Sequence, residues 1–183
     1  MNHYAEWTEI QKVHPQDQYE LKCIYSKMLG ACPDLEYIAL ADFLKCCNSI
    51  YILVDKVYGN ILGIIAIRLT DVEEATLEGL KYYCLDSKVL YKVEAFHCDG
   101  YVADNKFSEL VNTAIADKND GFIYYKPICP VAKEIEKLET FAGFREVFIT
   151  ASNGKTNTIY LKNPATYGES SPERQIEEVT ELA

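Results

Sequence analysis

The most constraining feature of this sequence is a pair of strongly periodic helical stripes, each enclosed between strand-like apolar runs. The stripes take their apolar residues from positions 107, 110, 111, 114 and 115, and from positions 131, 135, 138 and 142. This spacing puts each set on one face of a helix. The strand-like runs cover 89–98, 121–129, 145–151 and 156–162. Helices and strands in this order predict helices that pack on a sheet.

The N-terminal part of the chain adds further strands and helices. Residues 7–13 alternate as a strand does, and apolar residues at 21, 24, 25, 28 and 29 predict an amphipathic helix that ends at Gly30. A second helix is expected from Pro33, with inward-facing side chains at Leu40, Ala41, Phe43, Leu44 and Cys47. Runs 50–57 and 61–69 flank Tyr58-Gly59-Asn60 and predict a hairpin, whereas 70–87 has no regular period.

The whole element order predicts an α/β fold of the α+β type, with a mixed, largely antiparallel sheet flanked by helices. Asp104 or Asn105 is expected to cap the helix of the first stripe, and Asn153-Gly154 to form a tight turn between the last two strands. Residues 163–183 hold five Glu and one Arg, a net charge of −4. We therefore expect a folded domain over residues 1–162 and an acidic C-terminal tail over 163–183.

Composition excludes several classes of partner and of cellular location for this 183-residue chain. It carries 18 Lys and Arg against 28 Asp and Glu, a formal charge of −10, so direct nucleic-acid binding through phosphate contacts is not expected. The charge is also too dilute for an acidic mimic of nucleic acid. No apolar run approaches the ~20 residues of a membrane span, and the first residues lack the basic and apolar regions of a signal peptide. The sequence therefore predicts a cytoplasmic protein, or a component of a virus particle, without a membrane partner.

Cysteine and histidine are too irregularly placed to predict a metal site. Seven cysteines occur without a C-x-x-C spacing, and the chain has three histidines. Most of the cysteines lie among apolar residues, where a free thiol behaves as a small hydrophobic group. We interpret them as reduced core thiols and expect no metal ion.

Three segments resemble the GNAT superfamily of acyl-CoA N-acyltransferases. The hairpin 50–69, with Gly63 inside its second strand, looks like the family's second and third strands. Segment 138–144 looks like the end of the family's fourth helix, with its terminal Gly-Phe, and 158–162 looks like its closing strand. The resemblance spans about residues 7–162. It implies the GNAT fold, with acetyl-CoA as the cofactor of any active member.

The family's most diagnostic motif, a loop whose Arg or Gln and two glycines cradle the CoA pyrophosphate, is degenerate in this chain. Alignment places Val102, Asn105 and Phe107 at those three positions, and Lys106 is the positive charge of the loop, beside two aspartates. Glycine allows the backbone to approach a phosphate closely, and these residues do not. These four residues are the candidate cofactor-binding positions, and their identity predicts that no cofactor is held.

The resemblance also implies positions for catalytic groups. The family's frequent general acid, a tyrosine, aligns with Glu139, so Tyr124 or Tyr125 on the preceding strand is the replacement candidate. Glu94 and His97 are the candidates for a general base, because they lie on the strand beside which the family binds its substrates. In the alternative interpretation, Glu94 faces solvent and His97 packs as an ordinary imidazole.

Two functions stay open on these residues. The first is non-catalytic: a GNAT-like protein that acts as a protein-binding or assembly subunit, for example of a virus particle, because a fold does not determine function. The second is an active N-acyltransferase that moves an acetyl group from acetyl-CoA to an amine. The missing glycines favour the first function, and the backbone at residues 99–107 is the place to distinguish the two.

Overall fold

A single seven-stranded sheet organises the molecule in a computed structural model that describes residues 7–39, 42, 44–77, 79–80, 89–150, 154 and 156–164. The strands are β1 (Thr8–Val13), β2 (Ser49–Asp55), β3 (Ile61–Thr70), β4 (Leu90–Cys98), β5 (Phe122–Tyr125), β6 (Arg145–Thr150) and β7 (Thr156–Lys162). Their order across the sheet is β1-β2-β3-β4-β5-β7-β6. β4 and β5 are parallel, and the other neighbouring pairs are antiparallel. The predicted mixed, largely antiparallel sheet is therefore confirmed.

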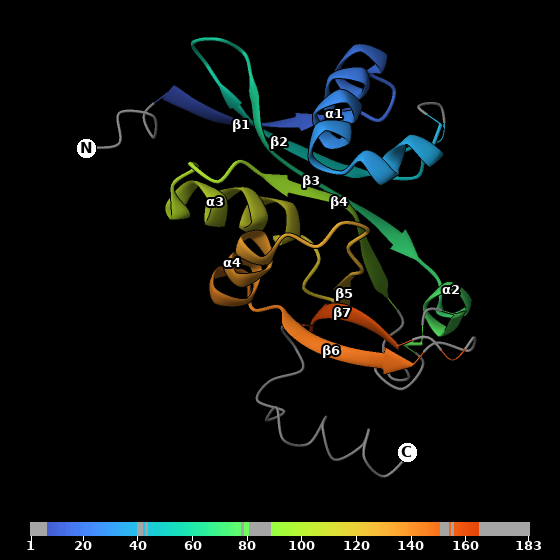
Figure 1. The fold of residues 1–183 in the computed structure, drawn as a ribbon. Coiled ribbons are helices and arrows are strands. Elements are labelled where there is room, and N and C mark those ends of the chain that lie inside the picture. The colour runs from blue at the N-terminus through green and yellow to red at the C-terminus, as the bar shows by residue number, and fades with distance from the viewer. Residues whose placement is uncertain are drawn as a thin grey trace.

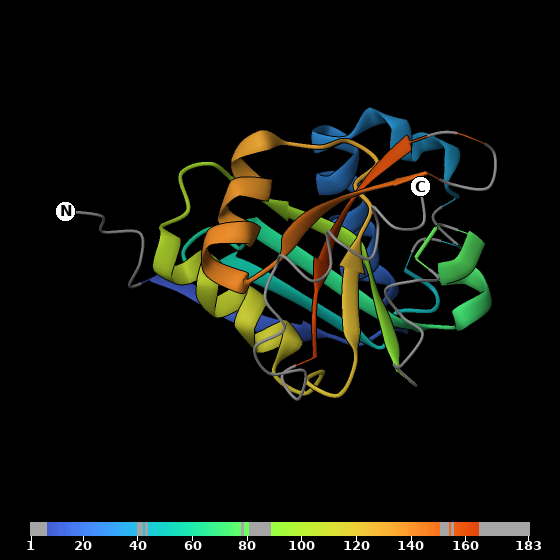
Figure 2. The same cartoon turned by 90° about the horizontal axis from the view of Figure 1, so that it is seen from below.

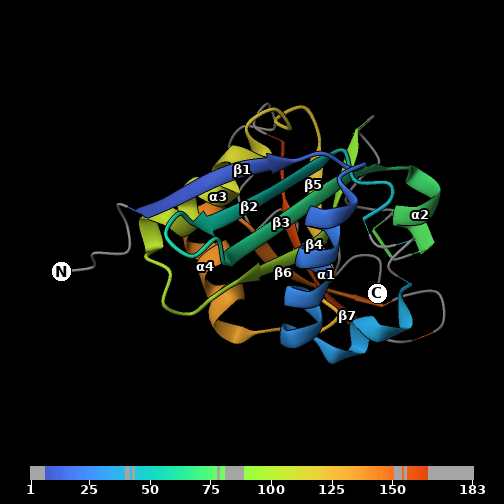
Figure 3. The same cartoon turned by 90° about the horizontal axis from the view of Figure 1, so that it is seen from above.

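Helices cover both faces of this sheet. The helix α1 (Gln18–Ala31) and the 3-10 helix η2 (Pro33–Tyr37) lie on one face (Figures 1 and 3). The helices α3 (Asp104–Ile115) and α4 (Ala132–Ala142) lie side by side on the other face (Figure 2). A short helix, α2 (Val72–Leu77), follows β3 at one end of the sheet. Among the described residues, no helix is long and apolar enough to span a bilayer.

Alternation along the strands divides the core between these two layers. Leu53, Ile65 and Val93 point toward α3 and α4, where they pack against Phe107 and Leu138. The residues that pack with α1 and η2 come from the opposite side of the same strands and include Ile52, Ile64 and Ala95. The first predicted stripe is thus the buried face of α3. Of the second stripe, Leu138 and Ala142 are buried in α4, whereas Ile135 is partly buried and Val131, the residue before the helix, is 40% exposed.

Two glycines explain local features of the fold. A Cβ atom on Gly63 would lie 2.9 Å from Leu110 Cδ2, so a side chain at this position of β3 would force Leu110 of α3 to move. Gly143 has a φ of 74° and ends α4 in the left-handed conformation, which is the usual role of a glycine after a helix. Gly63, inside the second strand of the predicted hairpin, and Gly143, in the Gly-Phe pair at the predicted helix end, therefore each have a physical role.

The first predicted helix is longer than expected and the second is much shorter. α1 continues through Gly30 to Ala31, since Pro33 and not the glycine stops it. The second helix is limited to η2, and Leu44 has a φ of 56°, which a continuing helix does not allow. Leu44 and Cys47 are buried, as predicted. The predicted inward positions 40, 41 and 43 lie outside the described residues.

Other boundaries change for equally local reasons. β5 ends at Tyr125 and not at 129, because Pro127 and Pro130 have no N–H to give to a neighbouring strand. The cap of α3 is Ala103 and not Asp104 or Asn105, so this helix starts without a side-chain cap. The expected turn residue Asn153 and all residues after 164 lie outside the described residues, so the division into domain and tail stays a prediction.

Candidate functional site

The sheet opens where its two parallel strands separate. β4 and β5 pair as far as Val93 and Tyr125, where β5 ends, whereas β4 continues to Cys98. Glu94 falls at a shift in the register between β3 and β4, and therefore forms a bulge in β4. A bulge reverses the alternation of side chains along a strand, so the outer half of β4 presents a different set of residues to each face.

A cavity of about 90 Å³ lies at this opening. The end of α1 contributes Met28 and Cys32 to its lining, β4 contributes Glu94 and His97, and the start of α4 contributes Glu134. A space of this size holds a few water molecules or one small chemical group. Of the four candidate catalytic residues, Glu94, His97 and Tyr125 line this cavity, whereas Tyr124 does not.

Four charged side chains, which we call the His97 cluster, connect three elements at this cavity. His97 Nδ1 lies 2.8 Å from Glu134 Oε1, and His97 Nε2 lies 3.0 Å from Asp99 Oδ1. Lys27 of α1 donates from Nζ to Asp99 Oδ2 at 2.9 Å. Glu134 Oε1 also accepts from the backbone N–H of Cys98 at 2.9 Å. The cluster therefore joins β4 to α4 through Glu134 and to α1 through Lys27.

The two carboxylates control the protonation of His97. The hydrogen bond with Glu134 raises the pKa of His97, burial opposes this, and the hydrogen bond with Asp99 adds to the increase. Burial alone would raise the pKa of Asp99, but hydrogen bonds from Lys27 and His97 hold it below its usual value. A protonated imidazole that donates to both carboxylates has no lone pair left to accept a proton. In its protonated form, therefore, His97 cannot act as a general base.

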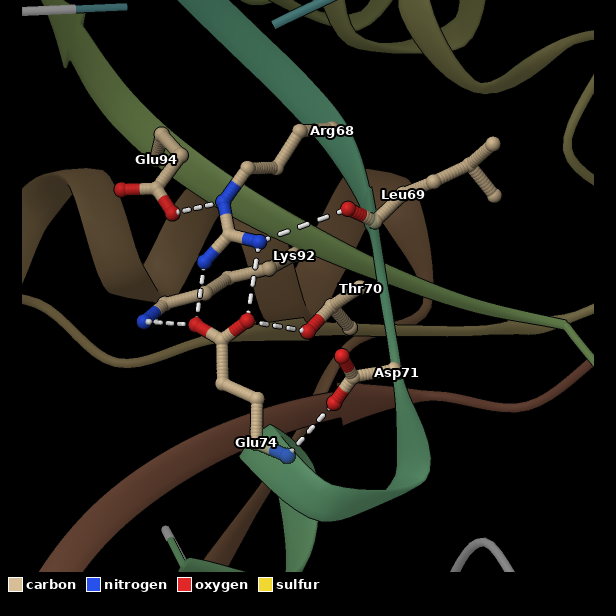
Figure 4. Close-up of polar contacts among 7 residues, drawn as sticks. All are labelled: Arg68, Leu69, Thr70, Asp71, Glu74, Lys92 and Glu94. Atoms are coloured by element: carbon tan, nitrogen blue, oxygen red, sulfur yellow. Dashed lines mark hydrogen bonds and ion pairs between the residues drawn. The ribbon is translucent and has the colours of Figure 1, made fainter. Parts of the chain in front are cut away.

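Glu94 belongs to a second group of charges, the Arg68 cluster (Arg68, Glu74, Lys92 and Glu94), shown in Figure 4. Arg68 Nε donates to Glu94 Oε1, and the two terminal nitrogens of the guanidinium donate to Glu74. Lys92 Nζ lies 3.6 Å from Glu74 Oε1. Hydrogen bonding with Arg68 lowers the pKa of Glu74 to about 2, although burial opposes this. Glu94 is thus held by a permanent cation.

Tyr124 lies away from the cavity. Its ring is fully buried in a separate apolar cluster with Leu90 and Leu161, and Lys92 Nζ lies 5.9 Å from the ring centroid. Tyr125, the next residue of β5, lines the cavity instead, because successive residues of a strand point to opposite faces. Burial raises the pKa of Tyr125, which keeps its hydroxyl protonated.

The candidate cofactor-binding residues at the start of α3 divide between core and surface. Phe107 is 0% exposed and Val102 is 7% exposed, and both pack in the apolar core beneath α3 and α4. Asn105 lies at the surface, and Lys106 Nζ forms an ion pair with Glu109 at 3.0 Å. The N-terminal end of the helix thus has buried apolar side chains at two of the four positions.

Lys137 of α4 lies against this helix start. Its Nζ is 3.4 Å from the carbonyl oxygen of Val102 and 3.5 Å from Asp104 Oδ1. The same ammonium group lies 5.6 Å from the centroid of the Phe107 ring. Lys137 of α4 therefore connects the two helices, because its ammonium group pairs with Asp104 at the start of α3.

A disulfide joins Cys32 at the end of α1 to Cys129, with their Cα atoms 5.7 Å apart. The expectation that all cysteines are reduced is wrong for this pair. Since 97 residues separate the two cysteines, their spacing in the sequence gave no signal of the bond. Burial raises the pKa of Cys47 and Cys98 to about 12, so these two free cysteines stay protonated and unreactive.

Sequence reasoning missed most of the partners that define both clusters. Arg68 and Lys27 belong to no motif, and Asp99 is one of the two aspartates near Lys106 in the degenerate loop. Glu134 did leave a signal, since it lies four residues before Leu138 and so on the buried face of the α4 stripe. A carboxylate at such a position needs a buried partner. Within the part of the chain that the structure describes, no group of three or more His, Cys, Asp or Glu side chains is arranged to hold a metal ion.

Comparison with known proteins identifies the fold of this chain. No family model matches the sequence, and no curated protein matches it. Solved structures do match. A polyamine N-acetyltransferase of Drosophila melanogaster that forms N-acetylagmatine superposes with a TM-score of 0.57 at 11% identity, over 85% of this chain and 99% of that chain. NAA60 of Arabidopsis thaliana, solved with acetyl-CoA, gives 0.54 at 15% identity, over 84% and 96%.

A third matching structure is described by its family. A GNAT-family acetyltransferase of Streptococcus agalactiae superposes with a TM-score of 0.56 at 10% identity, over 85% of this chain and 95% of that chain. The chain covers nearly the whole of each of these proteins. It therefore has the GNAT fold, as the sequence predicted. Identities this low describe the fold, and the activity has to be argued from the site.

Proposed function

We propose that this chain is a GNAT-fold protein with a degenerate acyl-CoA loop, and that it acts as a non-catalytic protein-binding or assembly subunit. The observation that carries the proposal is the burial of Phe107 and Val102, at 0% and 7% exposure, where the fold would need glycine backbone. The residues present do not fit a pyrophosphate, because apolar side chains stand at two of the four positions and Lys137, a cation at the helix start, is already paired with Asp104. This misfit supports a protein that does not use the cofactor of its fold.

The arrangement at the strand opening supports the same proposal. Glu134 accepts from the Cys98 N–H on the outer half of β4, so an extended ligand that paired with this edge would have to displace a buried carboxylate. The two candidate bases are also engaged, His97 with two carboxylates and Glu94 with Arg68. Both candidate bases therefore already have internal partners.

An exposed apolar corner supports a protein partner. Trp7, Val57 and Tyr58 are 54%, 58% and 77% exposed. The Lys56 N–H donates to the carbonyl oxygen of Trp7 at 2.7 Å, which places Trp7 beside the turn that follows β2. Tryptophan and tyrosine are enriched where proteins bind one another. A partner held at this corner, inside a cell or in a virus particle, completes the proposal.

The first test is a calorimetric titration of acetyl-CoA and of free CoA into the full chain. We expect no heat and no thermal stabilisation at millimolar cofactor, with NAA60 of Arabidopsis as the positive control. Binding at micromolar concentration would contradict the proposal. For the partner, we expect a protein that co-purifies with the wild type to be lost from the double variant Trp7→Ala, Tyr58→Ala. Tyr19→Ala, which changes a side chain 74% exposed elsewhere, is the matched control.

The second candidate function, acetyl transfer to an amine, is favoured by one observation, the cavity that brings Glu94, His97 and Glu134 together at the opening of the sheet. An assay of acetyl-CoA turnover on a panel of amines tests it. Turnover that is lost in His97→Ala and kept in His14→Ala would favour this candidate, because His14 is exposed and far along the chain from the cavity lining. Absence of turnover in the wild type would leave the non-catalytic proposal standing.

A further inference from the structure

The Cys32–Cys129 disulfide joins two sides of the cavity. Cys32 follows α1 directly, and Cys129 lies in the segment 126–131 between β5 and α4; both sulfur-bearing residues line the cavity. On the third side stands the outer half of β4 with His97. The bond therefore connects the helix layer on one face with the chain that leaves the sheet at its opening.

The segment 126–131 has left the sheet and is partly exposed. β5 ends at Tyr125, and Pro127 and Pro130 cannot donate to a strand ladder. Ile128 and Val131 are 54% and 40% exposed, whereas Cys32 is 6% exposed and packs with Met28 and Leu35. The disulfide thus anchors an exposed segment to a buried point of the α1 layer.

We propose that this disulfide is a redox-controlled clasp on the cavity: while it is oxidised, segment 126–131 is held against α1, and when it is reduced, the segment moves away and the cavity opens along β4. The inference does not depend on the proposed function, since it concerns access to the cavity and not what the cavity holds. It assigns a regulatory role to a bond that the sequence did not reveal.

The chemistry requires a dithiol reductant, either a small molecule or a thioredoxin-type protein. One thiolate of the reductant attacks Cys129 Sγ, the S–S bond breaks, and Cys32 Sγ leaves as a thiolate that takes a proton from water. The second thiol of the reductant then attacks its own sulfur in the mixed disulfide, so that Cys129 leaves as a thiolate and is protonated. Two electrons pass to the protein, and the reductant ends as a disulfide.

Exposure decides which sulfur is attacked. Cys129 is half-buried and Cys32 is buried, so a reductant reaches Cys129 first. Asp34 Oδ2 lies 3.7 Å from Cys129 Sγ, and its negative charge repels an approaching thiolate. The clasp should therefore react slowly with anionic thiols such as glutathione, and Asp34→Asn should speed that reaction severalfold.

The test is hydrogen exchange measured by mass spectrometry on the full chain, oxidised and then reduced with dithiothreitol. We expect reduction to add the mass of two hydrogen atoms and to accelerate exchange at least tenfold in peptides covering 126–131 and 94–98. The second peptide includes the Cys98 N–H, which Glu134 protects at 2.9 Å. Peptides from α3 should keep their rates.

Variants separate the clasp from a general loss of structure. Cys129→Ser should exchange like the reduced wild type and ignore dithiothreitol, whereas Cys46→Ser, which removes an exposed free thiol, should respond like the wild type. If Cys129→Ser fails to fold, reduced wild type alone decides the matter. Three results would overturn the proposal: no Cys32–Cys129 link in protein purified without reductant, no change on reduction, or acceleration that extends equally to α3.

Discussion

Strand β4 carries two charged clusters, one on each half, and they differ in the cation at the centre. On the inner half, Arg68 holds Glu74 and Glu94 and connects β4 to β3 and α2. On the outer half, His97 holds Asp99 and Glu134 and connects β4 to α4. Each cluster has two carboxylates, and those of the second cluster are the more buried. The central cation of the first cluster is permanent, whereas that of the second depends on pH.

The ion pairs of Arg68 are therefore independent of pH, whereas those of His97 depend on it. The interactions with Glu74 and Glu94 raise the pKa of Arg68 further above its already high value, so the charge of the first cluster is constant under all ordinary conditions. Histidine titrates near pH ~6.5 when unperturbed, and the carboxylates raise the pKa of His97 from there. The ion pairs of Arg68 on the inner half of β4 therefore do not depend on pH. The interactions at the outer half depend on the protonation of His97 and on the Cys32–Cys129 disulfide.

Removing the disulfide should have the largest effect on this contrast. Closing a loop of 97 residues lowers the entropy of the unfolded chain, so Cys129→Ser should lower the free energy of unfolding by about 4 kcal/mol. For a domain of this size we expect a melting temperature lower by roughly 10 °C. Calorimetry of the wild type, with and without reductant, measures the same quantity. A wild type whose melting temperature ignores reductant would contradict this prediction, and Cys46→Ser should melt as the wild type does.

Breaking the permanent cation should have the next largest effect. Arg68→Ala leaves two carboxylates close together without their partner and should lower the free energy of unfolding by about 3 kcal/mol. Arg68→Lys keeps the charge but not the forked geometry and should lose less. Urea denaturation at pH 6 and at pH 8.5 measures both variants. The loss should be the same at the two pH values, and a loss that changes with pH would show that the Arg68 cluster is not fixed.

Removing Glu134, the residue of α4 in the His97 cluster, should have a smaller effect. Glu134→Ala removes the acceptor of the Cys98 N–H and one partner of His97, and should lower the free energy of unfolding by about 2 kcal/mol. Glu134→Gln keeps an acceptor without the charge, so the pKa of His97 should fall toward its ordinary value. Nuclear magnetic resonance titration of the His97 ring measures that change. An unchanged His97 pKa in Glu134→Gln would place the cause elsewhere.

The sequence predicted the parts of the molecule whose structure depends on local spacing. The stripes that begin at Phe107 and Val131 became α3 and α4, and the hairpin around Gly59 became β2 and β3, because periodicity and turn residues act within a few positions. Prediction failed where the surrounding structure overrides the conformational preference of a residue: Gly30 stays helical and Leu44 adopts a positive φ. Pro127 shortens β5 in a run that otherwise has the composition of a strand.

The candidate site was predictable only in part, because its residues meet from distant parts of the chain. Alternation along one strand and the resemblance together named Glu94 and His97, which do line one cavity. Their partners Arg68 and Glu134 lie 26 and 37 residues away, and the partner of Asp99 is Lys27, a separation of 72. Contacts over such distances are set by the folded sheet and leave no period in the sequence. A bulge at Glu94 adds to this, since it changes which residues share a face.

The smallest expected effect concerns the proton on His97 itself. The folded-state pKa of His97 is raised, so its contribution to stability is complete below the unfolded value of ~6.5 and is lost as the pH rises through the folded-state value. The free energy of unfolding of the wild type should therefore fall between pH 6 and pH 9, a range above the ordinary pKa values of carboxylates. His97→Gln should remove this slope, whereas His14→Gln, at an exposed position, should keep it. Urea midpoints at half-unit pH steps measure the slope, and a slope that survives in His97→Gln would mean that the outer half of β4 is not held by this proton.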